Sequence, residues 1–342
     1  MDNFLAPIDQ LSALINRKAG ILFKDMSSIP VHTLGLPEAP LNYYLQRHHD
    51  RSFFSLQTAA ELLYRSISLK NKPVEELVIM DYGAGIGTLY LLAKMIGCKT
   101  VIYNDILEEM GAAAQIISEY LCVSVDHVIV GDHQKTLQQL DRDGLVCDIV
   151  LSRNVVEHIY DLNDFYGKMM QFQPQALIFF STTANYKNPA MLWYHKRVHQ
   201  QFEKKYKPRR KEIIQQQLPH LAELQAEQLA IATRGLAMDD LQAAIKAYDQ
   251  QQILPNPYVH YTNTCDPESG LWAEHIIPPS DYKSILNKNG YACAIHPAFW
   301  DTHYPNFFKN IFAKSMNTLT RVLGKKKGLK TTAFIYVIAQ KK

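Results

Sequence analysis

The chain has 342 residues, of which 47% are hydrophobic and 20% are charged, and its formal net charge is +3. This composition is typical of a globular protein and argues against a disordered or fibrous chain. The small net charge does not indicate a nucleic-acid partner, because proteins that bind phosphate backbones usually concentrate basic residues on one face.

The cysteines and the N-terminal residues bear on where the protein works. Five cysteines lie far apart and form no CxxC pair, so neither a zinc ribbon nor a disulfide framework is expected. The N-terminal residues lack the basic start and apolar block of a secretory signal, and no apolar run approaches the ~18 residues that span a membrane. We therefore expect a cytoplasmic protein with reduced cysteines.

The N-terminal region is predicted to be helical. Apolar residues recur at helical spacing over residues 8–19, and Gly20 is expected to end this helix. Three prolines between residues 30 and 40 predict a loop, and residues 41–67 predict an aromatic helix that leads into the next domain. We interpret residues 1–70 as an N-terminal helical lid.

Short apolar runs then alternate with helical stretches. They recur about every 25 residues, which is the length of one strand and one crossover helix. This spacing predicts a Rossmann-like α/β domain at residues 71–185, with a doubly wound, mostly parallel sheet and helices on both faces. The predicted strands lie at residues 77–80, 100–104, 127–131, 148–152 and 176–181.

The second half of the chain interrupts this rhythm and then resumes it. Residues 186–270 are predicted to form an inserted helical lobe, in which Asp239 or Asp240 caps one helix. Residues 271–342 are predicted to complete a seven-stranded sheet. Within them, residues 305–327 have the apolar spacing and the lysines of a basic amphipathic helix. This helix is expected either to pack against the sheet edge or to make peripheral contact with an anionic membrane.

Three glycines follow the first predicted strand of the α/β domain. Gly83, Gly85 and Gly87 stand two residues apart, where the chain turns from a strand into a helix. Glycine at such a turn lets backbone N–H groups approach a ligand closely. A dinucleotide-binding GxGxxG motif would need glycine at position 88, where the chain has Thr88, so a nicotinamide oxidoreductase is disfavoured.

The segment DYGAGIG, which begins at Asp81, resembles the first motif of the class I S-adenosylmethionine-dependent methyltransferases. The resemblance continues to about residue 185 and again from about residue 270 to the end. It implies that the glycine turn passes beneath the methionine part of S-adenosylmethionine (SAM) and that Asp81 helps to hold the amino group. The chain is therefore expected to be a methyltransferase with SAM as its cofactor.

Further residues are expected to complete the cofactor site. Asp105 ends the second strand and is suited to accept hydrogen bonds from both ribose hydroxyls, although it could instead cap the next helix. Asp132 follows the third strand, where the resemblance implies an acidic side chain near the adenine amino group; alone, it would mark an ordinary turn. The other predicted cofactor contacts are Ile106, His133, Arg153 and Asn154.

The segments CDIVLSRNVVEHIYDL and LWAEHIIPPSDYKSILNKNGY are similar to the catalytic part of this family. The resemblance implies that Glu157 and His158 lie beside the transferred methyl group. A helix over residues 154–158 would place Asn154 on the same face as this pair. If the acceptor is an alcohol or phenol, a base must take its proton, and His158 is the first candidate and His275 the second. Alternatively, His158 binds a neighbouring loop and Glu157 contacts the cofactor or caps the helix.

A metal-assisted mechanism is a competing interpretation. In small-RNA 2′-O-methyltransferases and ubiquinone-pathway O-methyltransferases, a similar segment presents two carboxylates and a histidine to a divalent ion. Here Asn154 stands in place of the first carboxylate, which lowers the charge available to a hard cation, although Glu274 and His275 could make up the number. We predict that no metal is bound.

The residues that bind the acceptor are less clearly indicated. Tyr44 and Arg51 in the N-terminal region, and Tyr194 and Glu274 around the inserted lobe, are predicted to contact the acceptor, although packing or a solvated helix face is the simpler explanation. The basic run at residues 204–211 could attract a phosphorylated or acidic acceptor, or it could form a solvated surface.

The preferred function is O-methylation of a small molecule or glycan precursor, by in-line transfer from SAM with a histidine as general base. One alternative is an RNA methyltransferase, suggested by the partial similarity to the RNA-modifying segment. Another is a non-catalytic partner subunit that binds the cofactor and uses the helical lobe as an interface. No motif identifies the acceptor or the oligomeric state.

Overall fold

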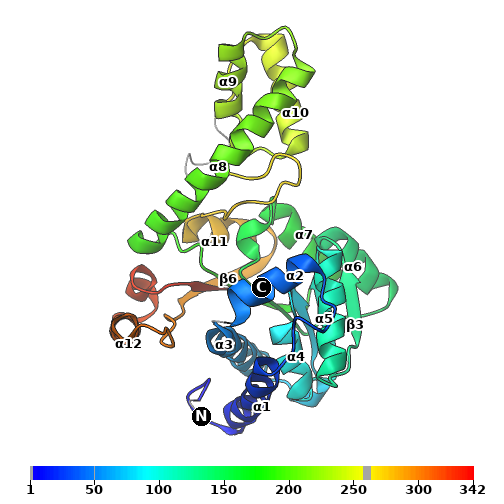
Figure 1. Cartoon of the computed structure of the whole chain (residues 1–342), viewed down its shortest axis with the longest axis vertical. Helices are drawn as coiled ribbons and strands as arrows, with labels where there is room; N and C mark the ends of the chain where they lie inside the picture. Colours follow the sequence, from blue (N-terminus) through cyan, green and yellow to red (C-terminus); the bar gives the residue numbers. More distant parts are fainter. Residues whose placement is uncertain (1–2, 50, 257–262) are drawn as a thin grey trace.

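Seven strands form one sheet in the computed structural model, which describes residues 3–49, 51–256 and 263–342 (Figure 1). The strands are β1 (Val78–Tyr82), β2 (Thr100–Asp105), β3 (His127–Val130), β4 (Ile149–Arg153), β5 (Leu177–Thr182), β6 (Tyr291–Pro297) and β7 (Ile335–Lys341). Their order is β3-β2-β1-β4-β5-β7-β6, and β7 is the strand that runs antiparallel to its neighbours in the described chain. The five strands predicted at residues 77–181 and the mostly parallel sheet are confirmed.

The winding of the sheet reverses between β1 and β4. Ile79 of β1 pairs with Val101 of β2 on one side and with Ile149 of β4 on the other. From β1 the chain winds outward through β2 and β3, whereas β4 and β5 extend the sheet in the opposite direction. Ligands of open α/β sheets bind at the carboxyl ends of the strands at such a switch point. The predicted site residues after β1 and β4 therefore lie at one edge of the sheet.

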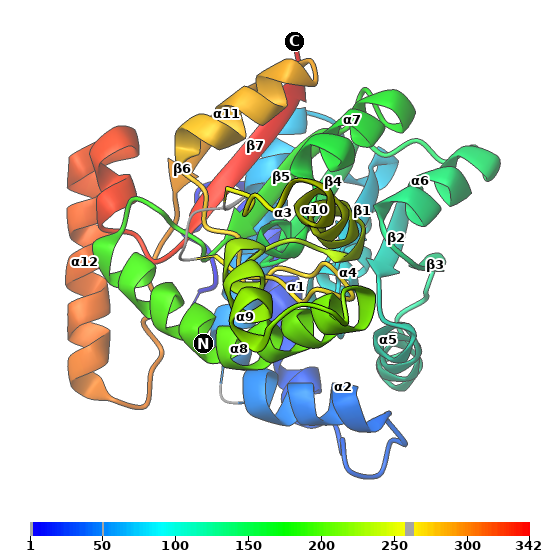
Figure 2. The ribbon, with the colours of Figure 1, turned by 90° about the horizontal axis from the view of Figure 1, so that it is seen from above.

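Helices cover both faces of this sheet (Figure 2). Ile79 and Met80, which are adjacent in β1, belong to two different apolar cores because successive strand residues point to opposite faces. The first core includes residues of α4 (Thr88–Met95) and α5 (Glu108–Tyr120), and the second includes residues of α6 (His133–Arg142), α7 (Leu162–Phe172) and α11 (Pro279–Lys288). The doubly wound α/β prediction is confirmed.

The N-terminal region forms α1 (Gln10–Ser27), α2 (Glu38–Tyr43), the π-helix η1 (Tyr44–His49) and α3 (Ser52–Lys70). The prediction that Gly20 ends the first helix is wrong, because Ala19 and Leu22 on either side of it are buried in the first core and the packing of α1 on α3 continues through this position. The single helix predicted over residues 41–67 is likewise divided among α2, η1 and α3.

The inserted helical lobe consists of α8 (Pro189–Gln217), α9 (Glu223–Ala232) and α10 (Met238–Gln251), at the top of Figure 1. It has an apolar core of its own, which includes Ile214, Leu229 and Leu241. The prediction that Asp239 or Asp240 caps a helix is wrong, because Ala237 is the N-cap of α10. Both aspartates instead stand in the first turn, where negative charge favours the helix dipole.

The predicted amphipathic helix is α12 (Phe307–Lys327), which follows β6 and lies at the edge of the molecule in both ribbon views (Figures 1 and 2). Short helices η2 (Val74–Glu76), η3 (Val156–His158) and η4 (Gly328–Lys330) complete the fold. Of the helices that the structure describes, none is long and apolar enough to cross a lipid bilayer.

Candidate functional site

The glycine loop joins β1 to α4 at the switch point. Gly83, Gly85 and Gly87 all have positive φ angles, of 68°, 57° and 79°, which L side chains rarely adopt. At Gly83, an added Cβ would lie 2.4 Å from Cγ2 of Val155, so the loop packs directly on the segment after β4. At Gly85, an added Cβ would meet no atom of the described chain within 4 Å. The loop therefore leaves open space above Gly85.

Asp105 holds this loop against the end of β2. One carboxylate oxygen accepts a hydrogen bond from the Gly85 N–H at 2.9 Å, and the other accepts one from the Leu107 N–H at 3.0 Å. Burial raises the pKa of Asp105. The alternative that Asp105 caps the next helix is wrong, because the N-cap of α5 is Leu107. Ile106, the next predicted cofactor residue, has half of its surface exposed beside Asp105.

Asp81 lies at the end of β1 and is almost completely buried. It accepts a hydrogen bond from the Tyr90 N–H at 3.0 Å, and burial raises its pKa to about 7 against the opposing effects of that bond and of Arg153. The guanidinium of Arg153 donates to the backbone oxygen and hydroxyl of Ser55 on α3, at 2.8 and 2.6 Å. Arg153 therefore joins the N-terminal region to the switch point, and its cationic charge lies near Asp81.

Asp132 and His133 begin α6 and have partners within the protein. Asp132 is the N-cap residue and accepts a hydrogen bond from the Lys135 N–H at 2.8 Å, and Nε2 of His133 lies 2.8 Å from the Asp164 carboxylate. Asp132 therefore caps α6 and does not mark an ordinary turn. The cofactor contacts predicted for both residues stay predictions.

The segment after β4 differs from the predicted helix over residues 154–158. Asn154 has a φ angle of 57° and its N–H donates to the Ser181 oxygen at 2.8 Å, so helical structure is confined to η3. The prediction that Asn154 shares a helix face with Glu157 and His158 is therefore wrong. Asparagine tolerates this left-handed conformation better than most residues do.

Glu157 and His158 are held by a segment from the far side of the inserted lobe. The backbone oxygen of Glu157 accepts a hydrogen bond from the backbone N–H of His275 at 2.6 Å. Nδ1 of the His158 ring lies 2.9 Å from the backbone oxygen of Trp272. Because a carbonyl oxygen can only accept, Nδ1 of His158 carries a proton, and in the neutral ring Nε2 therefore bears the lone pair. The loop contact expected in the alternative for His158 is present, whereas the roles of His158 and Glu157 stay predictions. The same bond leaves Nε2 of the neutral ring able to accept a proton.

The Glu157 side chain is buried, and its Oε2 atom has no hydrogen-bond partner within the described chain. Burial raises its pKa, with the nearby His158 acting in the opposite direction. A buried carboxyl oxygen without a partner is energetically costly, so it marks a position where a ligand group could donate.

His275 is less suitable than His158 as a base. Its ring stacks on Trp272 with 4.3 Å between ring centroids, and burial, followed by the neighbouring His199, lowers its pKa to about 4. At neutral pH this imidazole is uncharged and only weakly basic, whereas a general base works best with a pKa near the working pH.

The base of the lobe contributes two buried histidines, of which His199 was not among the residues expected in the site. His195 on α8 is buried, with Nδ1 against the Glu274 carboxylate and Nε2 2.9 Å from the Thr183 oxygen. His199, one turn further along α8, is buried close to His275. The four-residue spacing of His195 and His199 puts them on one helix face, which is a signal that the sequence contains. Tyr194 is half exposed, with its ring edge against His195.

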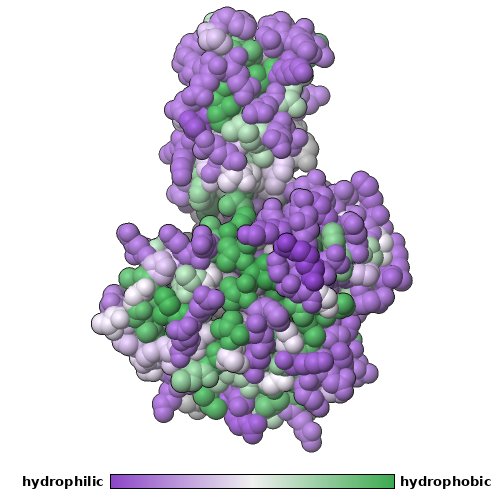
Figure 3. All heavy atoms as spheres, turned by 90° about the vertical axis from the view of Figure 1, so that its right-hand side faces the viewer, coloured by the Kyte–Doolittle hydropathy of each residue, from purple (hydrophilic) through white to green (hydrophobic). Residues whose placement is uncertain are grey.

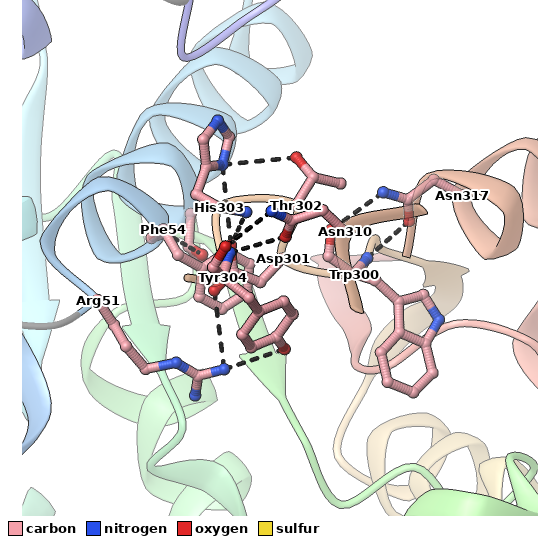
Figure 4. Close-up of polar contacts among 10 residues, drawn as sticks. Arg51, Phe54, Trp300, Asp301, Thr302, His303, Tyr304, Asn310 and Asn317 are labelled. Carbon is pink, nitrogen blue, oxygen red and sulfur yellow. Dashed lines mark hydrogen bonds and ion pairs between the residues drawn. The ribbon is translucent and has the colours of Figure 1, made fainter. Parts of the chain in front are cut away.

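The other two predicted acceptor residues are occupied by internal contacts. The Tyr44 hydroxyl is buried and donates to the Met26 oxygen at 2.7 Å. Arg51 donates to the Tyr304 hydroxyl at 3.1 Å and lies 3.7 Å from the buried Asp301 carboxylate (Figure 4). These contacts match the packing alternative, and acceptor binding by Tyr44 and Arg51 stays a prediction.

Ion pairs within the lobe neutralise much of the basic run at residues 204–211. Lys207 lies 2.6 Å from Glu227, Arg209 lies 2.6 Å from Glu268, and the buried Arg210 pairs with Glu203. These pairs favour the interpretation of this run as a lobe surface over that of a phosphate site. In the described residues, no three His, Cys, Asp or Glu side chains are grouped so that they could hold a metal ion.

The face shown in Figure 3 carries a strip of hydrophobic atoms that runs from the base of the lobe across the core, between polar flanks. Small-molecule sites are usually lined by apolar surface of this kind. The inserted lobe and the core both contribute to this strip.

Comparison with solved structures finds similar folds among methyltransferases. One is a magnesium protoporphyrin IX methyltransferase from Synechocystis with bound SAH (S-adenosylhomocysteine), at 12% identity and a TM-score of 0.41, over 95% of this chain and 100% of that chain. Another is an S-adenosylmethionine-dependent methyltransferase from Mesorhizobium loti, at 14% identity and a TM-score of 0.39, over 82% and 98%. No family model and no curated protein matches the chain. These similarities carry no argument about function, which must come from the site.

Proposed function

We propose that the chain is a SAM-dependent methyltransferase. The observation that carries the proposal is the open space above Gly85, at a topological switch point, in a loop that Asp105 holds through the Gly85 N–H. A Cβ at Gly85 would fill the space that a ligand needs. Asp81 would pair with the cationic amino group of SAM, and Asp105 has lone pairs left to accept from the ribose hydroxyls. The residues present therefore fit SAM.

The proposed reaction needs alignment of donor and acceptor, removal of a proton and exclusion of water. When bound, SAM supplies an electrophilic methyl group on a sulfonium sulfur. Nε2 of His158 takes the proton of an acceptor hydroxyl, while the Nδ1 hydrogen bond to Trp272 fixes the orientation of the ring. Trp272 and the histidines of α8 exclude water, which strengthens the electrostatic interactions inside the site.

We propose that the acceptor is a hydroxyl group of a small molecule or glycan precursor. Support comes from the His158 tautomer and from the unpartnered Glu157 oxygen, which could accept from an acceptor hydroxyl. Tyr194 and Glu274 stand at the base of the lobe, where they could form the outer wall of this site. The ion pairs of Lys207, Arg209 and Arg210 leave less free basic charge in residues 204–211 for a phosphorylated or acidic acceptor.

The domain division is part of the same proposal. Residues 71–185 form the cofactor-binding core, residues 186–270 the acceptor lobe and residues 271–342 the completion of the sheet. Residues 1–70 keep the lid function predicted for them, and α1, α3 and Tyr44 of η1 attach this region to the first apolar core.

Binding of SAH tests the proposal, with Gly85→Arg as the variant. The arginine would occupy the open space above the loop, so we expect SAH to bind at least about 100-fold more weakly by calorimetry, because a bulky side chain at a glycine that cradles a ligand excludes it. Gly144→Arg is the matched control, because Gly144 also has a positive φ, of 64°, and open space around its added Cβ, but lies in the turn before β4. Equal binding by both variants, or binding of NAD in place of SAH, would overturn the assignment.

A further inference from the structure

The last helix, α12, is oriented with polar side chains toward the protein. Ala313 and Thr320 are its buried residues, and Asn310 and Asn317 lie on the same side of the helix. The Asn310 side chain bonds to both the N–H and the oxygen of Tyr304, at 2.8 and 2.7 Å. The sequence left open whether this helix packs against the sheet edge or contacts a membrane. In the structure α12 contacts the edge strand β6, and the side that faces the protein carries small and polar residues.

A second asparagine bond pair fixes this orientation (Figure 4). The Asn317 side chain bonds to the N–H and the oxygen of Trp300, at 2.6 and 3.0 Å. The Trp300 indole in turn donates to the Thr331 oxygen at 2.6 Å. Helix α12 is therefore clamped to the loop that precedes it and to the segment that follows it. Rotating its apolar side inward would break both asparagine pairs.

The opposite face of α12 exposes large apolar side chains to solvent. Six residues on this face range from 38% to 79% exposed, and Phe308 and Val322 exceed three quarters. Four of the six stand in the first two turns of the helix and two near its C-terminal end, and large exposed apolar patches on a protein surface usually mark an interaction site. The six residues are Phe307, Phe308, Ile311, Phe312, Leu319 and Val322.

The charge around this face has one sign. Residues 302–342 contain eight lysines and one arginine and no aspartate or glutamate. Helical spacing places Lys314 and Arg321 along one flank of the apolar face, and both are exposed. Lys325, Lys326 and Lys327 follow the kink at Gly324 and are also exposed. An anionic lipid bilayer has apolar acyl chains beneath negatively charged headgroups. A helix with an exposed apolar face and a basic flank is complementary to both layers.

We propose that α12 docks on the surface of a membrane that contains anionic phospholipid. The exposed apolar face enters the boundary between headgroups and acyl chains, and the lysines and Arg321 lie among the lipid phosphates. Because α12 is clamped to β6 and to residues 300–304, docking would also fix the orientation of the whole core relative to the membrane. This inference does not depend on the proposed methyltransferase activity.

Vesicle flotation of the full chain tests the proposal. We expect binding to phosphatidylcholine vesicles that contain about 30 mol% phosphatidylserine and at least about tenfold weaker binding to pure phosphatidylcholine, because each basic residue near an anionic surface adds electrostatic attraction. Binding should weaken at about 0.5 M salt, where screening is stronger. The double variant Phe308→Asp/Phe312→Asp should bind at least about tenfold more weakly, since it removes two apolar side chains from the interface.

The control is Leu224→Asp/Ile231→Asp on α9, two apolar residues with 69% and 55% exposure on the lobe. This variant should bind vesicles like the unaltered chain. Both variants change exposed positions, and equal melting temperatures would show that both fold. The proposal is overturned if vesicles do not bind, or if the α12 variant binds as well as the control. It is also overturned if sedimentation without lipid shows a dimer that only the α12 variant dissociates, because α12 would then be an interface between two copies of the chain.

Discussion

Asp81 is almost completely buried, yet it is the residue proposed to meet a cation. In the free protein, burial raises its pKa from 3.8 to about 7. The unfolded chain loses this proton near pH 4 and the folded chain near pH 7, so the contribution of Asp81 to stability declines as the pH rises through that window. A bound ammonium group would favour the carboxylate and reverse the shift.

SAH binding should therefore release a proton below about pH 7. Affinity should fall by about tenfold for each pH unit below that value, because the protonated carboxyl cannot pair with the cation. Calorimetry between pH 5.5 and 8, in buffers of different ionisation enthalpy, measures both effects. Asp81→Asn should bind more weakly and without this pH dependence. A flat profile for the unaltered protein would remove Asp81 from the cofactor site.

The two candidate bases should separate in kinetics. His158→Gln should lower the rate of methyl transfer by about 100- to 10,000-fold, the usual contribution of a general base, and leave the SAH affinity unchanged. His275→Gln should lower the rate by less than about tenfold, since a base with a pKa far below the working pH contributes little. The measurement is incorporation of labelled methyl into a small-molecule extract. If His275→Gln lowers the rate more than His158→Gln does, His275 would be the general base in place of His158.

Several site residues could be predicted from the sequence because their chemistry is local. The glycine spacing requires a turn with positive φ angles, and Asp105 ends a strand beside that turn. The conformation of Asn154 could not be predicted, because its left-handed φ follows from the bond to Ser181 on the neighbouring strand. The tautomer of His158 depends on Trp272, which is more than a hundred residues away in the chain.

At the scale of elements, the glycine loop has one position where packing within the fold requires glycine and another where a bound ligand would require it. Gly83 faces Val155, whereas Gly85 faces open space. Both have positive φ angles, so any side chain there carries a similar backbone cost. A difference in stability between alanine variants at the two positions therefore measures the contact of Gly83 with the segment after β4.

Gly83→Ala should destabilise the protein by roughly 2 to 5 kcal/mol, as the sum of overpacking against Val155 and backbone strain. Gly85→Ala should cost only about 1 to 2 kcal/mol, from the backbone alone. Urea unfolding of the free protein measures both values. Equal losses would show that Gly83 does not pack against Val155 as described.

The strands were predictable because short apolar runs bounded by turns can bury both faces of a parallel sheet. Helix limits were less predictable. Gly20 lies within α1 because the packing of Ala19 and Leu22 outweighs the cost of glycine inside a helix. That cost is only about 1 kcal/mol relative to alanine. At α10, the aspartates stabilise the first turn without capping it.

At the scale of the whole molecule, the candidate site combines segments from three parts of the chain. The switch point brings together the loops after β1 and β4, and this follows from strand order. The contacts of His195 with Glu274 and of His158 with Trp272 join α8 and residues 272–275 to that edge. No periodicity encodes such contacts, because they depend on how the lobe folds back.

The direction of α12 also belongs to this scale. Its spacing predicts an amphipathic helix but does not say which face meets the protein. Asn310 and Asn317 decide the matter through bonds to residues 300–304. Tyr304 in this loop also accepts a hydrogen bond from Arg51 at the start of α3. Residues 300–304 therefore contact both α12 and the N-terminal region.

The most direct test of the central claim is a crystal structure of the protein with SAH. The account predicts that the ribose hydroxyls lie within hydrogen-bond distance of Asp105, that the amino group lies near Asp81, and that the sulfur points toward His158 above Gly85. SAH at another place, or a glycine loop that stays closed against the ligand, would contradict it.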